Sequence, residues 1–507
     1  MRAFEGLNAY YGDLHNHCSI SYGHGSLEQA LNNAQQQLDF CSVTGHALWP
    51  DMPEADDDIQ AMVDYHLEGF ARLRACWPEV LRTIEARNKP GTFITFPSFE
   101  MHSCADGDYT ILYKDAEGEL LNAVGLDDLR HRLRTLKSQG IEAIAFPHHI
   151  AYHRGQRGIN WTTFEEEFSP IVEIISMHGC SEADENTHSF LHVMGPSDHE
   201  STMQYGLGQG AFFGVIGSTD HHSAYPGSYG HGRTGLWAYA KTRESIWEAL
   251  CSRRTYALTG DKISLEFAIN DCPMGSRINV KEARQLSFHV IGGAPLDYVD
   301  IVKNGEILRR FSRCDMRCAG ELETIRTKLY LEVGWGERGK PVTWDIEFGI
   351  SDGRILAVEP RFRGPEIVEP TAHALRGLPS EWELDDSRGV RFRAETFGNP
   401  NNRTPATQGI CLHVEMPVKA AVNCLINGHR VEFPLTRLVE GARSGRLGKI
   451  GSACYRLHRA PYQWEYDWRG SLDDLPDESG QADIYYARVR QANDEWAWSS
   501  PIQVNLS

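Results

Sequence analysis

Histidine and carboxylate side chains recur at short spacings in the first 222 residues of the chain. His15 and His17 stand two residues apart, and Asp220 and His222 repeat that spacing. Side chains at i and i+2 of an extended segment point to the same face, so each pair can bind one ion. Imidazole and carboxylate groups are ligands for zinc, manganese and iron. The further candidate ligands are His46, Glu100, His148 or its neighbour His149, and His178. The pattern predicts a site for divalent metal ions.

Most of these candidates follow short apolar runs that are typical of buried strands. The runs cover residues 40–43, 92–96, 141–146, 171–175 and 212–216. Helical patterns at 26–39, 126–138 and 243–252 alternate with them, as in a series of parallel β/α units. Functional side chains cluster at the carboxyl ends of barrel strands, so these groups should converge on one pocket. Residues 51–87 form a helical excursion that is expected to pack over the barrel.

The second half of the chain has a different composition and pattern. Of the 22 histidines, 17 lie in residues 1–260, and the remaining sequence alternates short strands with turn signals. Asn304-Gly305 is a strong hairpin signal among them. The sequence therefore predicts an α/β metal-binding barrel in residues 1–260. A β-rich, sandwich-like domain without a catalytic role is expected in residues 261–507.

The ordered motifs of the first half resemble the PHP (polymerase and histidinol phosphatase) superfamily. They are Asp13-Leu14-His15-Asn16-His17, Gly45-His46, Glu100, His148, His178 and Gly217-Ser218-Thr219-Asp220-His221-His222. The resemblance covers roughly residues 8–260. It is closest to a poorly characterised branch with a β-rich C-terminal extension.

This resemblance implies a distorted seven-stranded β/α barrel with two or three divalent metal ions (Mn, Zn or Fe). The implied ligands are His15, His17, Glu100 and Asp220 for the first ion, bridging Glu100 with His148 and His178 for the second, and His46 and His222 for the third. Two departures affect the third site. Tyr22-Gly23-His24 stands where the family has an acidic residue or histidine, which leaves His24 one residue out of register. Gly45 stands in place of an aspartate.

The chemistry expected from such a centre is hydrolysis. In the first hypothesis a metal-bridging hydroxide attacks a phosphate ester, because bound cations lower the pKa of water. Asp220 and Glu100 are the carboxylates on which turnover should depend. Arg233 should orient the anionic group, and His153 and His231 are candidate proton donors to the leaving group. The same centre could instead hydrolyse an amide, ester or lactone. A third hypothesis is a non-catalytic binding module.

Composition excludes several other classes. The formal net charge of −19 argues against a nucleic-acid partner, which would require a basic footprint. No apolar run is long enough to span a membrane, and residues 1–6 lack the apolar stretch that is expected of a secretory signal. The 12 cysteines lack the spacing of a zinc ribbon or disulfide scaffold, so reduced thiols in a cytoplasmic protein are expected. Cys18 and Cys180 are not expected to be nucleophiles. We expect a small anionic substrate, and assembly into a homo-oligomer is left open.

Overall fold

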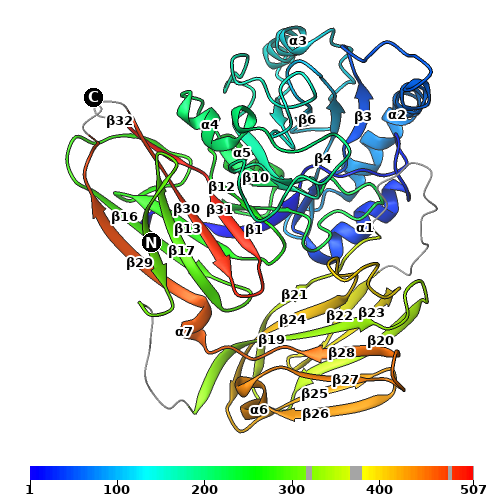
Figure 1. Ribbon diagram of the computed structural model, residues 1–507, viewed down its shortest axis with the longest axis vertical. Coiled ribbons are helices and arrows are strands. Elements are labelled where there is room, and N and C mark those ends of the chain that lie inside the picture. The colour runs from blue at the N-terminus through cyan, green and yellow to red at the C-terminus, as the bar shows by residue number, and fades with distance from the viewer. Residues whose placement is uncertain (316–322, 366–379, 478–481, 506–507) are drawn as a thin grey trace.

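The computed structural model describes residues 1–315, 323–365, 380–477 and 482–505 (Figure 1). It is a mixed α/β protein with several sheets and few helices, which confirms the predicted class. The α-helices in these ranges are α1 (Leu27–Gln37), α2 (Gln60–Arg87), α3 (Leu126–Ser138), α4 (Met203–Gly208), α5 (Arg243–Cys251), α6 (Leu435–Glu440) and α7 (Gln463–Tyr466). None of the described helices is long and apolar enough to cross a membrane.

The strands that precede the candidate ligands belong to three sheets. The first sheet contains β1 (Asn8–Asp13), β2 (Phe40–Ser42), β4 (Ile94–Phe96), β11 (Arg233–Ala238) and β12 (Thr255–Leu258). The second contains β3 (Gly45–Leu48), β5 (Ser98–Met101), β6 (Tyr109–Tyr113) and β7 (Ala143–Pro147), and the third β8 (Ile171–Ser176), β9 (Gly179–Cys180) and β10 (Gly214–Gly217). β6 is antiparallel to β5 and β7, and β11 is antiparallel to β1. The hydrogen bonds between described strands therefore do not show a closed barrel of parallel strands.

The three sheets nevertheless enclose one core. Buried side chains from five of their strands belong to a single cluster, namely Phe40, Phe96, Phe146, Ile171 and Ile216. Trp247 of α5 joins the same cluster. Burial of each such side chain contributes roughly 1.5–3 kcal/mol, so this shared interior holds the sheets together. The carboxyl ends of β1, β5, β7, β8 and β10 consequently lie close enough to bring the candidate ligands together.

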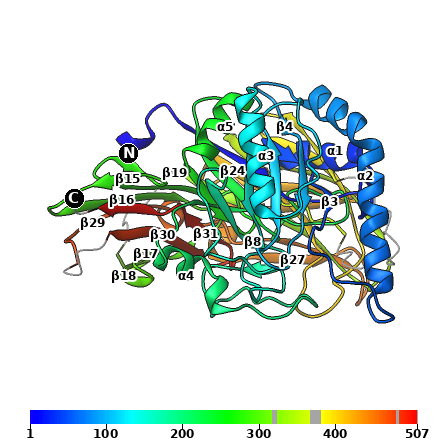
Figure 2. The same cartoon turned by 90° about the horizontal axis from the view of Figure 1, so that it is seen from above.

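Two helices illustrate how local sequence fixes the elements around this core. α1 begins where Ser26 Oγ accepts a hydrogen bond from the backbone N–H of Gln29 at 3.1 Å, as the sequence predicts. α2 is the predicted excursion, and it runs along one side of the molecule in Figure 2. A Cβ atom at Gly45 would lie 2.5 Å from the buried side chain of Leu73 on α2. The missing aspartate at Gly45 is therefore explained by the close approach of α2.

Most described strands from β13 onward form two β-sandwiches (Figure 1). In the first, β13 (Ser264–Ile269), β14 (Cys272–Pro273), β16 (Arg284–Ile291) and β29 (Asp467–Asp474) face β15 (Arg277–Asn279), β17 (Leu296–Lys303), β18 (Glu306–Ser312), β30 (Asp483–Gln491) and β32 (Ile502–Asn505) across a shared core. The second has one sheet of β19 (Thr324–Trp335), β21 (Arg354–Pro360), β24 (Gln408–Pro417), β27 (Arg443–Arg446) and β28 (Ala453–Leu457). Its other sheet has β20 (Val342–Ile350), β22 (Glu381–Asp386), β23 (Gly389–Thr396), β25 (Ala421–Ile426) and β26 (His429–Pro434).

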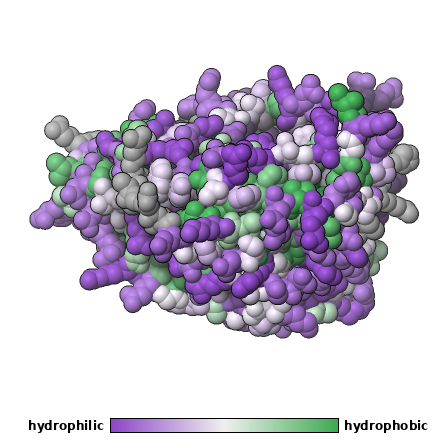
Figure 3. Space-filling view, turned by 90° about the horizontal axis from the view of Figure 1, so that it is seen from below, coloured by the Kyte–Doolittle hydropathy of each residue, from purple (hydrophilic) through white to green (hydrophobic). Residues whose placement is uncertain are grey.

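The first sandwich is continuous with a sheet of the first half of the chain. β31 (Trp496–Ser499) pairs with β12 on one side and with β30 on the other, so strands from both ends of the chain share one sheet. The predicted hairpin at Asn304-Gly305 is confirmed, with φ angles of 52° and 86°. The division of the chain at residue 260 stays a prediction. Viewed from below, where the second sandwich is nearest, the surface is mostly hydrophilic (Figure 3).

Two buried carboxyl groups lie where the three parts of the chain meet. Asp261 accepts a hydrogen bond from the hydroxyl of Tyr229 at 2.7 Å and lies 3.1 Å from Arg361 Nη2 of the second sandwich. Glu495, from the first sandwich, contacts the hydroxyl of Thr259. Burial raises the pKa of Glu495 to about 7, and the charge of Asp261 adds to the effect. Glu495 is thus held as a neutral acid below this pH.

We predict that Glu495 makes the folded state less stable as pH rises. A carboxyl group with a raised folded-state pKa binds its proton more tightly when folded. Its contribution to the stability of the folded state is therefore complete below pH 4.5, the usual pKa of a glutamate, and is lost as the pH rises through about 7. Glu495→Gln should raise the free energy of unfolding at pH 8 by about 1–3 kcal/mol and change it little near pH 5. Denaturant unfolding at both pH values measures this. Glu383→Gln, an exposed site on β22, is the control, and an unchanged pH dependence in Glu495→Gln would contradict the assignment.

Candidate metal centre

The structure brings the predicted ligands together at the ends of strands from all three sheets. The loop after β1 carries His15 and His17, β3 carries His46, β5 carries Glu100, the turn after β7 carries His148 and His149, the turn after β8 carries His178, and the turn after β10 carries Asp220 and His222. His222 is the most exposed of these side chains, at 27%. The others are buried. The fold therefore brings the predicted ligands close together, and their role in binding metal stays a prediction.

Glu100 lies at the middle of this group. Its Oε2 atom is 3.4 Å from Nε2 of both His15 and His17, and 3.5 Å from Nε2 of His46. Its Oε1 atom is 3.3 Å from Nε2 of His148. The two carboxylate oxygens thus face two different sets of imidazoles, which is the arrangement that a bridging carboxylate needs.

Asp220 is a second carboxylate whose two oxygens face different imidazoles. Its Oδ1 atom lies 3.0 Å from His17 Nε2 and 3.2 Å from His15 Nε2, whereas Oδ2 lies 2.8 Å from His178 Nε2. His178 is therefore grouped with Asp220 and His149, and not with Glu100 and His148 as predicted. β8 and β10 pair in parallel, so the turns that follow them are neighbours. This pairing places His178 next to Asp220. The sequence left open whether His148 or His149 is the ligand. Both side chains lie in the cluster.

The polar atoms of this group suit divalent cations. Four buried atoms of this group have no hydrogen-bond partner among the described residues: His15 Nε2, His148 Nε2, His149 Nδ1 and Glu100 Oε2. Buried polar atoms are almost always paired, and a bound ion is one of the few explanations for an exception. Imidazole nitrogens and carboxylate oxygens are also the donors that zinc, manganese and iron accept. The residues present fit the metal ions that the sequence predicts.

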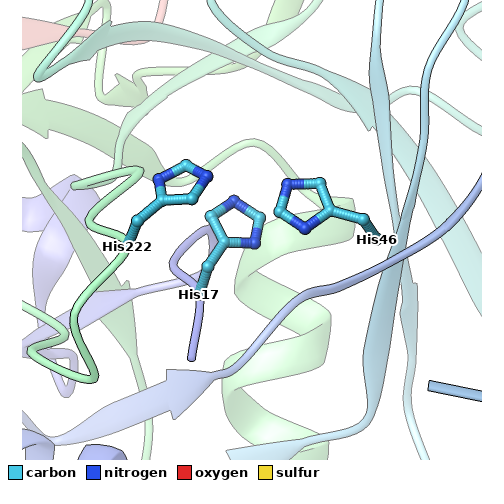
Figure 4. A group of neighbouring side chains, drawn as sticks. All are labelled: His17, His46 and His222. Carbon is cyan, nitrogen blue, oxygen red and sulfur yellow. The ribbon is translucent and has the colours of Figure 1, made fainter. Parts of the chain in front are cut away.

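The third group consists of His17, His46 and His222, whose rings lie close together (Figure 4). The ring centroids of His17 and His46 are 4.0 Å apart, and those of His17 and His222 are 4.3 Å apart. Tyr22 stacks on His46 at 3.5 Å and donates toward His102 from its hydroxyl at 2.8 Å. His24 belongs to none of the described ligand groups, so the structure does not give it the predicted ligand role. Tyr22 takes the neighbouring position and closes this side of the cluster.

Outer hydrogen bonds orient most of these imidazoles toward the centre. Nδ1 of His15 lies 2.8 Å from Glu173 Oε2, and Nδ1 of His17 lies 2.6 Å from the carbonyl oxygen of Thr44. Nδ1 of His178 is 2.5 Å from the hydroxyl of Tyr152. Binding the outer nitrogen in this way fixes the ring and leaves Nε2 for a metal ion.

The electrostatic environment leaves most of these groups in the protonation states that metal ligands need. His15 differs, because burial alone would lower its pKa but the charges of Asp220 and Glu173 raise that pKa well above its usual range. Burial lowers the pKa of His46, His148 and His222, to about 3 for His222, and neighbouring imidazoles strengthen the effect. Burial alone would raise the pKa of Glu100 and Asp220, but the surrounding imidazoles hold both pKa values well below their usual range. Most of the ligands are therefore neutral imidazoles or ionised carboxylates at neutral pH.

Two members of the cluster were missed from the sequence. His102 Nδ1 lies 3.1 Å from Glu100 Oε1 and 2.9 Å from Asp108 Oδ2. His102 stands two residues after Glu100, so the same i, i+2 argument could have found it. Asp108 precedes β6, and because β6 is antiparallel to its neighbours its beginning lies where their ends lie. A search restricted to the carboxyl ends of strands could not find it.

The predicted role of Arg233 also needs correction. Arg233 was predicted to bind the substrate, but its buried guanidinium donates to the carbonyl oxygen of Gly227 at 2.6 Å and to Gln37 Oε1 at 2.9 Å. It therefore fixes the loop that follows β10. Arg157 is the arginine beside the cluster, since its Nη2 contacts Asp108 and lies 2.5 Å from His102 Nδ1.

The predicted proton donors also lie elsewhere. His153 is 62% exposed and its Nδ1 lies 2.8 Å from Asp198 Oδ2. The ring of His231 stacks on that of His221 at 5.7 Å, and neither residue belongs to the described ligand groups. His153 and His231 are held away from the cluster by contacts with Asp198 and His221, which their spacing in the sequence does not reveal.

The cysteines near the centre are buried and free. Burial raises the pKa of the Cys18 thiol to about 12, and it raises the pKa of the Cys180 thiol as well. A reactive cysteine needs a lowered pKa. We predict that Cys18→Ala and Cys180→Ala retain most of the hydrolytic activity, measured as kcat/KM of the metal-loaded protein. Trapping of a covalent substrate adduct on either thiol would contradict this.

We predict that the purified protein binds at least two divalent ions. Glu100→Gln should lower the metal content by more than one ion per chain, because its two oxygens face separate ligand sets. Elemental analysis after purification without chelators measures this, and removal of the metal should also lower the thermal midpoint. His153→Ala is the control and should leave the content unchanged. An unchanged metal count in Glu100→Gln would refute the bridging role.

Comparisons with known proteins do not assign the chain to a family. No family model matches it. An uncharacterized protein of Chlamydia pneumoniae is 34% identical over 172 residues, which are 31% of this chain and 28% of that protein. An uncharacterized protein of Chlamydia muridarum is 32% identical over 171 residues, again 28% of its length. The matched part thus spans little more than a quarter of these relatives.

One solved structure is a more distant neighbour. It is a two-domain protein from Bacteroides vulgatus, described as containing a predicted PHP-like metal-dependent phosphoesterase. The match covers 61% of this chain and 86% of that chain, with 15% identity and a TM-score of 0.32. A similarity of this size does not carry a conclusion about fold or activity.

Proposed function

We propose that this protein is a metal-dependent hydrolase that acts on phosphate esters of small anionic molecules. The observation that carries the proposal is the burial of Glu100 among imidazoles from four strand ends, with unpartnered nitrogen and oxygen atoms directed at one another. The ordered motifs that resemble the PHP superfamily point in the same direction. A distorted β/α barrel is part of the proposal, because the three sheets share one core.

The roles of the chain's own residues follow from their positions. His15, His17, His148 and Glu100 would hold ions on one side of the centre, and His149, His178 and Asp220 would hold them on the other. Bound ions would activate a water molecule as the nucleophile and stabilise the charge of the transition state. Each ring is oriented before substrate arrives, so little reorganisation is required when the reaction begins.

Arg157 is the residue that we assign to substrate orientation. Its guanidinium is 17% exposed and lies beside the cluster, held by the buried carboxylate of Asp108. The cation also packs over the ring of Trp49 at 5.2 Å. A fixed planar guanidinium binds phosphate in a bidentate way, which favours a phosphate ester over an uncharged amide, ester or lactone.

A substrate panel tests the proposal. The protein, loaded with manganese, zinc or iron, is assayed on phosphomonoesters, phosphodiesters, amides, esters and lactones. We expect turnover of phosphate esters and a loss of at least about a thousandfold in kcat for Asp220→Asn, as when a group that acts in the transition state is removed. Turnover of amides or lactones alone would reassign the scissile bond. Metal binding without turnover of any substrate class would favour a binding module.

Arg157 and Arg154 provide a matched pair of variants. Arg157→Ala should lower kcat/KM on phosphate esters by about tenfold to a hundredfold, the effect of one or two charge-assisted hydrogen bonds. Arg154, three residues earlier, is exposed, and Arg154→Ala should have little effect. Metal content is measured in both, so that loss of an ion is distinguished from loss of substrate binding. Equal activity of the two variants would contradict the role of Arg157.

A further inference from the structure

The second sandwich carries a groove that the metal centre does not use. The groove has a volume of about 1180 Å³. It is formed by the end of β19, by residues 399–405, and by the edge hairpin of β27 and β28. None of the candidate metal ligands lines it.

The charge of this groove is opposite to that of the chain. Five arginines line it, and its lining contains no aspartate or glutamate. They are Arg338, Arg403, Arg443, Arg446 and Arg456. The chain as a whole has a formal net charge of −19. Two other grooves of the same sandwich contain carboxylates such as Glu347, so the absence of acids here is not a general property of this surface.

Neutral groups and strand register position the arginines. Arg338 donates to the carbonyl oxygen of Asn399 at 3.0 Å and to Asn402 Oδ1 at 2.7 Å. Ser444 faces Arg456 across β27 and β28, and Arg446 follows Ser444 by two residues. Arg446 and Arg456 therefore project from the same face of the hairpin. Within the described ranges neither guanidinium forms an ion pair, so both are available to an anion.

Acidic side chains close to the groove are already engaged. Glu332 faces Arg456 across β19 and β28, but its Oε2 atom lies 2.7 Å from His458 Nε2. Its other oxygen accepts a hydrogen bond from Thr407 at 2.5 Å. Arg443 lies 3.3 Å from Glu440, which is outside the lining. The positive charge of the remaining arginines is thus not neutralised by these neighbours.

A second, independent feature is the backbone at Trp335. This residue lines the groove with a φ angle of 55°, a conformation that bulky residues rarely adopt. Gly334 and Gly336, at 150° and 81°, flank it and permit the sharp turn. Strained backbone of this kind is concentrated at binding and catalytic sites. The turn leaves the indole half-buried at the groove, with Tyr455 also in the lining.

The loop opposite is organised by its own hydrogen bonds. Asn401 Oδ1 accepts from the backbone N–H groups of Arg403 and Thr404 at 2.8 and 2.9 Å. Asn399 Oδ1 accepts from the N–H of Ala406 at 2.8 Å. The loop is therefore formed in advance of binding, which lowers the entropic cost of ordering it.

We propose that this groove binds an oligosaccharide that carries carboxylate groups. Guanidinium groups pair with carboxylates, asparagine and serine side chains can donate to and accept from hydroxyl groups, and Trp335 offers a flat apolar face to a sugar ring. The chain's net negative charge disfavours a nucleic acid. A peptide added to a sheet edge would be recognised mainly by backbone groups, whereas this groove is lined by charged side chains.

Titration calorimetry on the full chain tests the proposal with oligogalacturonate as the probe. We expect binding that weakens with added salt, and no comparable binding of the uncharged maltohexaose. Arg446→Ala and Arg456→Ala should each weaken binding about tenfold, the effect of losing one charge-assisted pair. Arg456→Lys should give an intermediate loss, because it keeps the charge without the planar fork. Trp335→Asn, which tolerates the positive φ, should also weaken binding.

Arg393→Ala is the matched control, since Arg393 is an exposed arginine on the other sheet of this sandwich. It should change affinity less than about twofold. All variants should keep the wild-type thermal midpoint and metal content. Absence of oligogalacturonate binding at millimolar concentration would overturn the proposal, as would an equal loss in Arg393→Ala. Tighter binding of single-stranded DNA or of polyglutamate would overturn it in favour of that class of ligand.

Discussion

The burial of Glu100 beside imidazole rings is the interaction on which the rest of the structure depends. An isolated carboxylate in a protein interior is strongly unfavourable, so it must be matched by nearby positive charge or a metal ion. Here the imidazoles that contact Glu100 come from the loops after β1, β5 and β7 and from β3. His222, after β10, joins two of them in a further group. These segments can meet only if three sheets hold their strand ends at one place. The apolar core around Phe96 and Phe146 supplies that rigidity.

The turns that carry ligands are held in conformations that other contacts enforce. Asp220 and His149 have positive φ angles of 53° and 33°, which non-glycine residues seldom adopt. The buried carboxylate of Asp13 accepts hydrogen bonds from Thr219 and from the backbone N–H of Gly227, and so ties β1 to the turn after β10. Such strain persists only where surrounding structure over-determines it. The geometry of the centre therefore belongs to the scaffold and not to the ligands alone.

The two sandwiches are joined to this scaffold in different ways. The first shares a continuous sheet with β12, whereas the second meets the other parts through buried charges such as Arg361 and Asp261. Charge is also segregated between sites. Carboxylates are concentrated at the candidate metal centre, and arginines are concentrated in the groove beside Trp335. A single chain can thus attract cations at one site and anions at another.

The sequence by itself determined which candidate ligands the chain carries and which strands precede them. The apolar run before Glu100, the serine cap of α1 and the Asn304-Gly305 hairpin are local signals, because each depends on side chains within a few residues of one another. Tertiary structure alone decided which groups share a partner. The pairing of β8 with β10 placed His178 beside Asp220, and the antiparallel course of β6 brought in Asp108. The tertiary structure also directs Arg233 to the carbonyl oxygen of Gly227. Contacts of these kinds depend on strand order and direction, which local spacing does not encode.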